Sequence, residues 1–183
     1  MELTQTDESL MLAVKNGNLS KASILFDRYN KHLYNFFVKI TMDREVGEDL
    51  TQNVFLRMIK YKHTFQKGST FKSWIFRIAR NAQADYYRKR EKMQTKDVEL
   101  NTFASDVLVK EDELAKSEQE KLLYIALFRL KAEQREIILL SKFEKLKYED
   151  IATIYDTSIS AIKTRVHRAI GDLKKVFFEL EKI

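Results

Sequence analysis

Apolar residues recur at helical spacing over long stretches of this chain, which contains only four glycines and no proline. Glycine and proline are the residues that most often end helices and form tight turns, so long helices and few hairpins are expected. The pattern therefore predicts an all-α fold. In the first half it predicts helices over residues 9–14, 20–40, 43–60 and 71–92.

The helical pattern weakens over residues 93–119 and then returns. In the second half it predicts helices over residues 120–130, 133–143, 148–155 and 159–180. We expect two small helical domains, residues 1–92 and 120–183, joined by a linker that is flexible or partly helical. A turn at 156–158 joins the last two helices in a helix-turn-helix pattern. An ordinary amphipathic helical pair with a basic exterior would look similar, so this alternative stays open.

Charge is segregated along the chain, whose formal net charge is +6. Residues 57–92 carry 11 Lys or Arg against 2 Asp or Glu, whereas residues 97–120 carry 8 acidic residues against 2 Lys. The basic stretch permits a polyanionic partner such as nucleic acid. The acidic stretch coincides with the expected linker and indicates a solvated tether.

Composition excludes several kinds of site. The chain has no cysteine, and its three histidines lack the spacing of metal ligands, so we expect no metal and no cofactor. No phosphate-binding loop or acidic metal cluster indicates an enzyme. No apolar run is long enough to span a membrane, and the N-terminus lacks the features of a signal peptide. We therefore expect a cytoplasmic protein without membrane insertion.

The stretch 71–90 has two helical faces with different chemistry. One face gathers Ile75, Ile78, Ala79, Ala82 and Tyr86, and the other gathers Trp74, Arg77, Asn81, Asp85 and Arg88. Cations, an aromatic ring and amide or carboxylate groups on one face suit nucleic acid, including unstacked strands. Two alternatives stay open, because a lone Trp is more often core and the cations at 88–90 could form a solvated helix end.

The last predicted helix also has an apolar and a polar side. Ile162, Val166 and Ala169 mark the apolar side. Small residues at its start, Ser160 and Ala161, would let the helix end approach a DNA groove. The other side and the flanks carry groups that can reach bases or phosphates, namely Lys163, Thr164, Arg165, His167 and Arg168.

Three segments together resemble the sigma-70 superfamily, and in particular the small extracytoplasmic-function (ECF) sigma factors. They are VGEDLTQNVFLRM (46–58), FQKGSTFKSWIFRIARNAQADYYRKR (65–90) and YEDIATIYDTSISAIKTRVHRAIGDLK (148–174). Their order and spacing agree with a family that has only region 2 and region 4 domains. The resemblance covers roughly residues 9–92 and 120–178.

The resemblance implies an RNA polymerase sigma factor that binds core polymerase and directs promoter-specific initiation. The β′ clamp coiled coil would bind a helix surface made of Glu48, Asp49, Leu50, Gln52, Asn53, Phe55, Leu56 and Arg57. The −10 element, partly melted, would be held by a base-capturing loop at 63–69 and by the next helix. The residues implied there are Lys67, Gly68, Ser69, Phe71, Trp74, Arg77, Arg80, Asn81, Asp85, Arg88 and Lys89.

The second domain would read the −35 element as duplex and would also touch the polymerase β flap. The resemblance assigns −35 recognition to Ser158, Ser160, Ala161, Lys163, Thr164, Arg165, His167 and Arg168. Many members of the family are sequestered by an anti-sigma factor, so this kind of partner is implied as well. In the first domain, flat or apolar surfaces for unstacked bases would come from Phe71, Trp74 and either Tyr86 or Tyr87.

The chain departs from the family pattern at a few positions. Asn53 stands where many relatives have Glu, which makes the docking surface less acidic. Lys147 replaces the usual Ser or Thr cap, so a weaker helix start is expected, offset in part by Glu149 and Asp150. A common Pro before Glu133 is absent.

Two other classes of function compete with the sigma factor. One is a stand-alone helix-turn-helix regulator that binds operator DNA as a dimer, and the other is a nucleic-acid enzyme. The first lacks a ligand-sensing partner domain and does not explain the nucleic-acid surface of the first half. The second lacks any recognisable catalytic motif. In addition, Glu48 and Asp49 have a simpler explanation as acids that complement a helix dipole.

Overall fold

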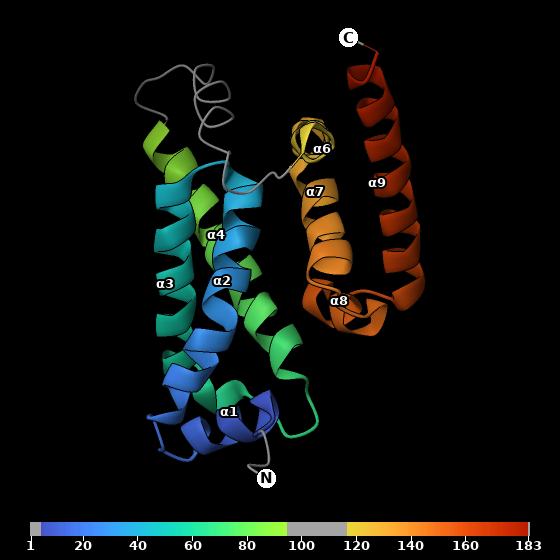
Figure 1. The fold of residues 1–183 in the computed structure, drawn as a ribbon. Coiled ribbons are helices and arrows are strands. Elements are labelled where there is room, and N and C mark those ends of the chain that lie inside the picture. The colour runs from blue at the N-terminus through green and yellow to red at the C-terminus, as the bar shows by residue number, and fades with distance from the viewer. Residues whose placement is uncertain (1–4, 95–116, 183) are drawn as a thin grey trace. The chain divides into compact units, whose positions relative to one another are not determined.

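The structure is a computed structural model that describes residues 5–94 and 117–182 (Figure 1). Every regular element within these two ranges is helical, which confirms the all-α prediction. The expected linker, residues 93–119, lies almost wholly outside the described residues. The elements are α1 (Asp7–Lys15), α2 (Lys21–Thr41), α3 (Arg44–Lys60), η1 (Lys62–Thr64), α4 (Phe71–Gln94), α6 (Glu118–Arg129), α7 (Ala132–Ile138), η3 (Leu139–Phe143), α8 (Tyr148–Tyr155) and α9 (Ile159–Leu180).

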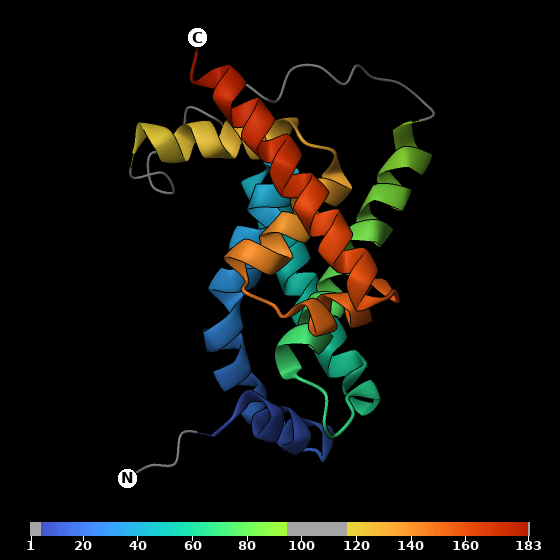
Figure 2. The ribbon, with the colours of Figure 1, turned by 90° about the vertical axis from the view of Figure 1, so that its right-hand side faces the viewer.

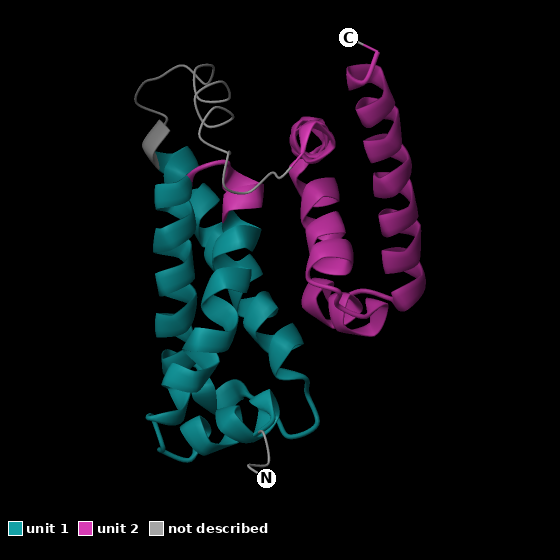
Figure 3. Ribbon diagram, in the orientation of Figure 1, with its two compact units in different colours: residues 1–37, 44–93 teal, residues 38–43, 94–183 magenta. Residues whose placement is uncertain are grey.

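The described residues form two compact units, coloured separately in Figure 3. The first unit takes its described residues from 1–37 and 44–93, and so contains α1, α3, α4 and most of α2. The second unit takes its described residues from 38–43 and 94–183, and so contains the elements from α6 to α9.

Aromatic rings fill the core of the first unit. Phe36, Phe37, Phe65, Phe71 and Phe76 are all fully buried. The ring centroids of Phe36 and Phe76 lie 5.3 Å apart with their planes at 84°, which is the edge-to-face arrangement that aromatic pairs prefer. Because these rings hold α2 against α4, they also decide which face of α4 is left for solvent.

Polar contacts fasten α1 to α2. Asp7 accepts a hydrogen bond from the Tyr29 hydroxyl at 2.6 Å and another from the Arg28 guanidinium at 2.5 Å. Burial raises the pKa of the Tyr29 hydroxyl far above its ordinary value, and the hydrogen bond to Asp7 raises it further. The hydroxyl therefore stays protonated, and it continues to donate at any ordinary pH.

The second unit packs α6, α7 and α8 against the long helix α9. Where the sequence predicts one helix over 133–143, α7 ends at Ile138 and the chain continues as a wider π-helical turn, η3. Ile137, Ile138, Leu139 and Leu140 are all buried, at 1% exposure or less. A regular helix would turn some of four consecutive residues outward, and the widened turn accompanies their joint burial.

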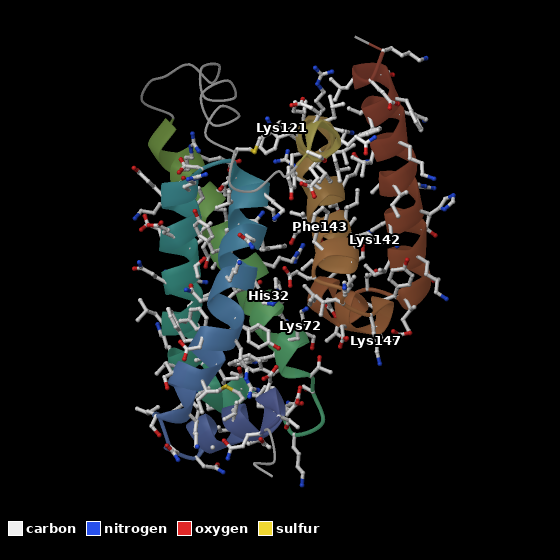
Figure 4. All side chains as sticks on the ribbon, in the orientation of Figure 1. His32, Lys72, Lys121, Lys142, Phe143 and Lys147 are labelled. Atoms are coloured by element: carbon white, nitrogen blue, oxygen red, sulfur yellow. The ribbon has the colours of Figure 1, made fainter. Side chains whose placement is uncertain are left out.

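The connection between α8 and α9 is short and clearly capped. Asp156 takes a left-handed conformation with φ 51° and ends α8. Ser158 begins α9, and its hydroxyl accepts the N–H of Ala161 at 3.2 Å. Both confirm the turn and cap expected at 156–158. The side chain of Lys147, labelled in Figure 4, gives α8 no capping hydrogen bond, and the weaker start expected for this helix stays a prediction.

Candidate nucleic-acid interface

α4 buries its apolar face and presents its polar face to solvent. Thr70 begins the helix, because its hydroxyl accepts the N–H of Ser73 at 3.3 Å. Ile75, Ala79 and Ala82 are buried against the rest of the first unit. Of the residues expected to meet nucleic acid, Arg77, Asn81, Arg88 and Lys89 are exposed, whereas Trp74, Arg80 and Asp85 are half-buried.

The loop before α4 ends in an exposed tip. Lys67 and Gly68 are exposed and Ser69 is half-buried. Gly68 has φ +96°, a left-handed backbone conformation that residues with a Cβ rarely adopt. The tip therefore depends on glycine at this position.

Trp74 supports this loop from the helix side. Its indole N–H donates to the Thr64 hydroxyl at 3.3 Å. Its ring meets the buried ring of Phe65 edge to face, with centroids 5.3 Å apart. Because Trp74 is only half-buried, the structure combines the two explanations that the sequence left open, with part of the side chain packed and part exposed.

Phe71 requires a correction. The resemblance to the sigma-70 superfamily placed it among residues that offer a flat surface to unstacked bases, but its side chain is 0% exposed. Its ring lies 5.0 Å from that of Tyr29 in edge-to-face geometry, inside the core. As the first residue of α4 it sits where the helix enters the core, so its ring holds the start of α4 and cannot stack on a base without unpacking.

Asp85 joins the two helices whose surfaces the sequence assigned to different partners. One of its oxygens accepts from Arg57 of α3, with 2.7 Å between Nη1 and Oδ2, and the other accepts from Arg88. The hydrogen bond from Arg57 holds the pKa of the Asp85 carboxyl below its ordinary value, with smaller contributions from the charges of both arginines. Both carboxylate oxygens are thus occupied, which leaves Asp85 poorly placed to read a base.

The surface of α3 is polar around one apolar side chain. Glu48, Asp49, Gln52 and Asn53 are exposed, and Leu56 is 71% exposed. A single exposed leucine is common on protein surfaces and does not by itself indicate a contact with another molecule.

Leu50 and Phe55 need a second correction. Both were expected in the polymerase-docking surface, but they are 5% and 8% exposed. They pack α3 onto the first unit and can act on docking only by holding the helix in place. Arg57 is half-buried through its ion pair with Asp85.

A groove between α2 and α3 extends this surface beyond the residues found from the sequence. It is lined by Phe26, Asn30, Lys31, Tyr34, Glu48, Thr51 and Gln52. Phe26 is 41% exposed, and its ring contacts that of Phe55 with centroids 4.7 Å apart. Helical spacing gives no signal for this exposure, because Phe26 lies only about 20° around the helix from the buried Phe37.

In the second unit, α9 carries the residues expected to read duplex DNA. Ser158, Ser160, Lys163, Thr164, His167 and Arg168 are exposed, as is Arg165, while Ala161 is half-buried. Four of them already have partners within the unit, because the hydroxyls of Ser158 and Ser160 also share a hydrogen bond at 3.0 Å. Ser158 caps the helix, Thr164 donates to the Ser160 carbonyl at 3.0 Å, and Arg165 lies 3.3 Å from Glu133 of α7. Lys163, His167 and Arg168 are therefore the clearest candidates for contacts to DNA.

Within 5–94 and 117–182, no cluster of three or more His, Asp or Glu side chains could hold a metal ion. In the same ranges, no helix has the length and apolar character needed to cross a lipid bilayer.

These features define a class of protein: a helical DNA-binding protein with one basic helix beside a loop in its first unit and a helix-turn-helix in its second. Family comparison makes this specific. Residues 25–93 match the model of sigma-70 region 2, and residues 121–173 match that of sigma-70 region 4. The chain belongs to the sigma-70 family, as an ECF RNA polymerase sigma factor.

Individual relatives agree with this assignment. The ECF RNA polymerase sigma factor SigX of Bacillus subtilis is 31% identical over 159 residues, which cover 83% of this chain and 81% of SigX. The RNA polymerase sigma factor YlaC of the same organism is 28% identical over 153 residues, which cover 82% of this chain and 88% of YlaC.

Among solved structures, the sigma factor RpoE of Bartonella quintana, in complex with the anti-sigma factor NepR, superimposes with a TM-score of 0.72 at 28% identity. The match covers 84% of this chain and 94% of RpoE. CnrH, solved with the cytosolic domain of CnrY, shares the fold at the same TM-score with 19% identity.

Proposed function

We propose that this ECF sigma factor binds core RNA polymerase through α3, holds the −10 element on α4 and the loop before it, and reads the −35 element with α9. The observation that carries the proposal is the exposed face of α4. Arg77, Asn81 and Arg88 lie on one side of a helix whose other side is buried, directly after an exposed loop tip. A melted strand needs this combination of cations and groups that can pair with bases.

The docking role of α3 is supported by its exposed side chains. Leu56 offers an apolar anchor with Glu48, Asp49, Gln52 and Asn53 around it, which resembles the apolar centre and polar rim of protein interfaces. Phe26 of α2 adds a second exposed apolar group. We assign this surface to the β′ clamp of core polymerase, by resemblance to the family.

The role of α9 is supported by its capped start and its exposed cations. Ser158 caps the helix, and the small Ser160 and Ala161 lie in its first turn beside the exposed Ile159, so the helix end can approach a major groove. Lys163 and Arg168 can neutralise phosphates or reach base edges. The second unit would also touch the β flap.

Several coarser assignments follow from this proposal. Sigma factors act as transcription initiation factors rather than as enzymes, and we assign this chain no catalytic role. We place it in the cytoplasm, because its partner there is the RNA polymerase that transcribes the genome. We expect an anti-sigma factor to bind it, since RpoE was solved in complex with the anti-sigma factor NepR. The similarity across both units favours this function over a stand-alone helix-turn-helix regulator.

Transcription in vitro tests the proposal most directly. Core polymerase from the source bacterium, with and without this chain, is given genomic fragments, and the start sites of new transcripts are mapped. We expect initiation at a discrete set of sites that share −10 and −35 sequences. The free chain should bind the same DNA weakly and with strong salt dependence. Failure to direct initiation with a matched core would refute the proposal.

A further inference from the structure

α1 contacts the loop that precedes α4, and it lies before residue 25, where the match to sigma-70 region 2 begins. Figure 2 shows this helix and the loop beside each other at one end of the first unit. Two side chains of α1, Glu8 and Lys15, make polar contacts to the backbone at the two ends of the loop. Neither contact has a role in the function proposed above.

Lys15 fixes the first end of the loop. Its ammonium group donates to the carbonyl oxygen of Phe65 across 2.6 Å, in a part-buried position. The ring of Phe65 is itself fully buried. The side chain and the carbonyl of this residue are therefore both held, and a hydrogen bond from a charged donor is stronger than a neutral one.

Glu8 fixes the second end. Its carboxylate accepts the backbone N–H of Phe71, the first residue of α4, at 3.0 Å. This N–H is one of those that a helix start leaves without an intrahelical partner. The helix dipole also favours a negative charge at this end, so the contact both satisfies the backbone and suits the local field.

The tip of the loop, residues 66–69, stands between these two fixed points. Gln66, Lys67 and Gly68 are exposed, so the tip is available to a ligand. α1 can act as a support because Asp7 fastens it to α2 through Arg28 and Tyr29.

We propose that Glu8 and Lys15 are positioning residues that hold the loop tip in place for the flipped base of the −10 element. This inference rests on the proposed function, in which that loop captures the base. Neither side chain needs to touch DNA. A loop that is already ordered loses less conformational entropy when the base enters, so capture becomes more favourable.

The chain carries its own reporter of the loop. Trp74 is the single tryptophan and contacts Thr64 and Phe65. In free Lys15→Met and Glu8→Ala variants, we expect acrylamide to quench Trp74 about twice as efficiently, because the loop opens locally. Lys15→Arg keeps a charged donor and should stay close to wild type. Lys21→Met and Glu45→Gln, which change similar charges on α2 and α3, are the matched controls. Unchanged quenching in both test variants would overturn the proposal.

The holoenzyme provides the second test, on a promoter found in the transcription experiment above. With core affinity unchanged, Lys15→Met and Glu8→Ala should slow open-complex formation about tenfold, the effect of losing one charge-assisted hydrogen bond. Abasic sites are then placed at each −10 position in turn to find the base whose removal slows the wild type most.

The abasic promoter separates positioning from a general loss of stability. If the loop acts through the captured base, the variants should lose little more when that base is absent, because both changes remove the same interaction. With Lys15→Arg, the rate of open-complex formation should again depend on the captured base as it does in the wild type. If the slowing caused by a variant and the slowing caused by the abasic site multiply in full, as independent effects do, the inference is overturned while the proposed function stays intact. A holoenzyme that initiates nowhere would instead overturn the proposed function, and this inference with it.

Discussion

The Asp85 carboxylate of α4 receives the Arg57 guanidinium of α3, with 2.7 Å between Oδ2 and Nη1. The hydrogen bond from Arg57 lowers the pKa of Asp85 in the folded protein, so the charged carboxylate stabilises the fold. This contribution is fully present above the pKa of an unfolded aspartate, about 3.9, and is lost as the pH falls through the lower folded pKa.

We predict that Asp85→Asn lowers the free energy of unfolding of the first unit by about 1 kcal/mol at pH 7, a modest value because the ion pair is partly exposed. The difference between variant and wild type should shrink as the pH falls below about 4. Urea unfolding followed by Trp74 fluorescence reports on this unit. A difference that stays constant between pH 7 and pH 3 would contradict the assignment to Asp85.

Leu56 should be an anchor for core polymerase. We predict that Leu56→Ser weakens binding to core polymerase at least about tenfold, as truncation of a buried interface residue does. Stability should change by no more than about 0.5 kcal/mol, because the side chain is 71% exposed in the free chain. Leu19→Ser is the matched control, since Leu19 is 51% exposed but lies between α1 and α2. If a core-binding titration shows the same loss of affinity for Leu56→Ser and Leu19→Ser, this would argue against a specific surface on α3.

Asn81 and Arg168 should act on different steps of initiation. Asn81→Ala removes an exposed amide from α4 and should slow promoter opening about tenfold, with little effect on initial duplex binding. Arg168→Ala removes an exposed cation from α9 and should weaken the closed complex and reduce its salt dependence. Stopped-flow measurement of closed- and open-complex formation separates the steps. Equal effects of the two variants on both steps would undo this division.

Capping should set the stability of the helix-turn-helix. Lys147 gives α8 no side-chain cap, whereas Ser158 caps α9. We predict that Lys147→Ser raises the free energy of unfolding of the second unit by about 0.5–1 kcal/mol and that Ser158→Ala lowers it by about 1 kcal/mol. Hydrogen exchange of the backbone amides in α8 and α9 measures both. A Lys147→Ser variant with unchanged protection would show that the weak start is not limited by the missing cap.

Features that depend on helical periodicity could be predicted from the sequence. The two faces of α4, with Ile75 and Ala79 inside and Arg77 and Asn81 outside, follow directly from residue spacing. The Ser158 cap could also be predicted, because capping is a local interaction between residues three apart.

Features that depend on packing between distant segments could not be predicted. Helical spacing places Phe71 in phase with the buried Ile75, Ile78 and Ala82, so its burial could have been predicted, whereas its contact with Tyr29 of α2 could not. The pairing of Arg57 with Asp85 joins residues from two helices, and each residue taken alone looks like a surface group of its own helix. Such contacts follow from how helices cross, which a spacing pattern in one helix does not contain.

The widened turn at η3 has a consequence for how this protein is compared with its relatives. A π-helical turn holds one residue more than an α-helical turn, and it arises without breaking the helix. Removal of one residue between Leu139 and Phe143 would therefore restore a regular helix and rotate Glu144 and Leu146 relative to α7. We expect some relatives to lack this residue, so that an insertion or deletion of one position marks the segment in evolution. An alignment drawn through it without a gap would pair buried positions of one protein with exposed positions of the other.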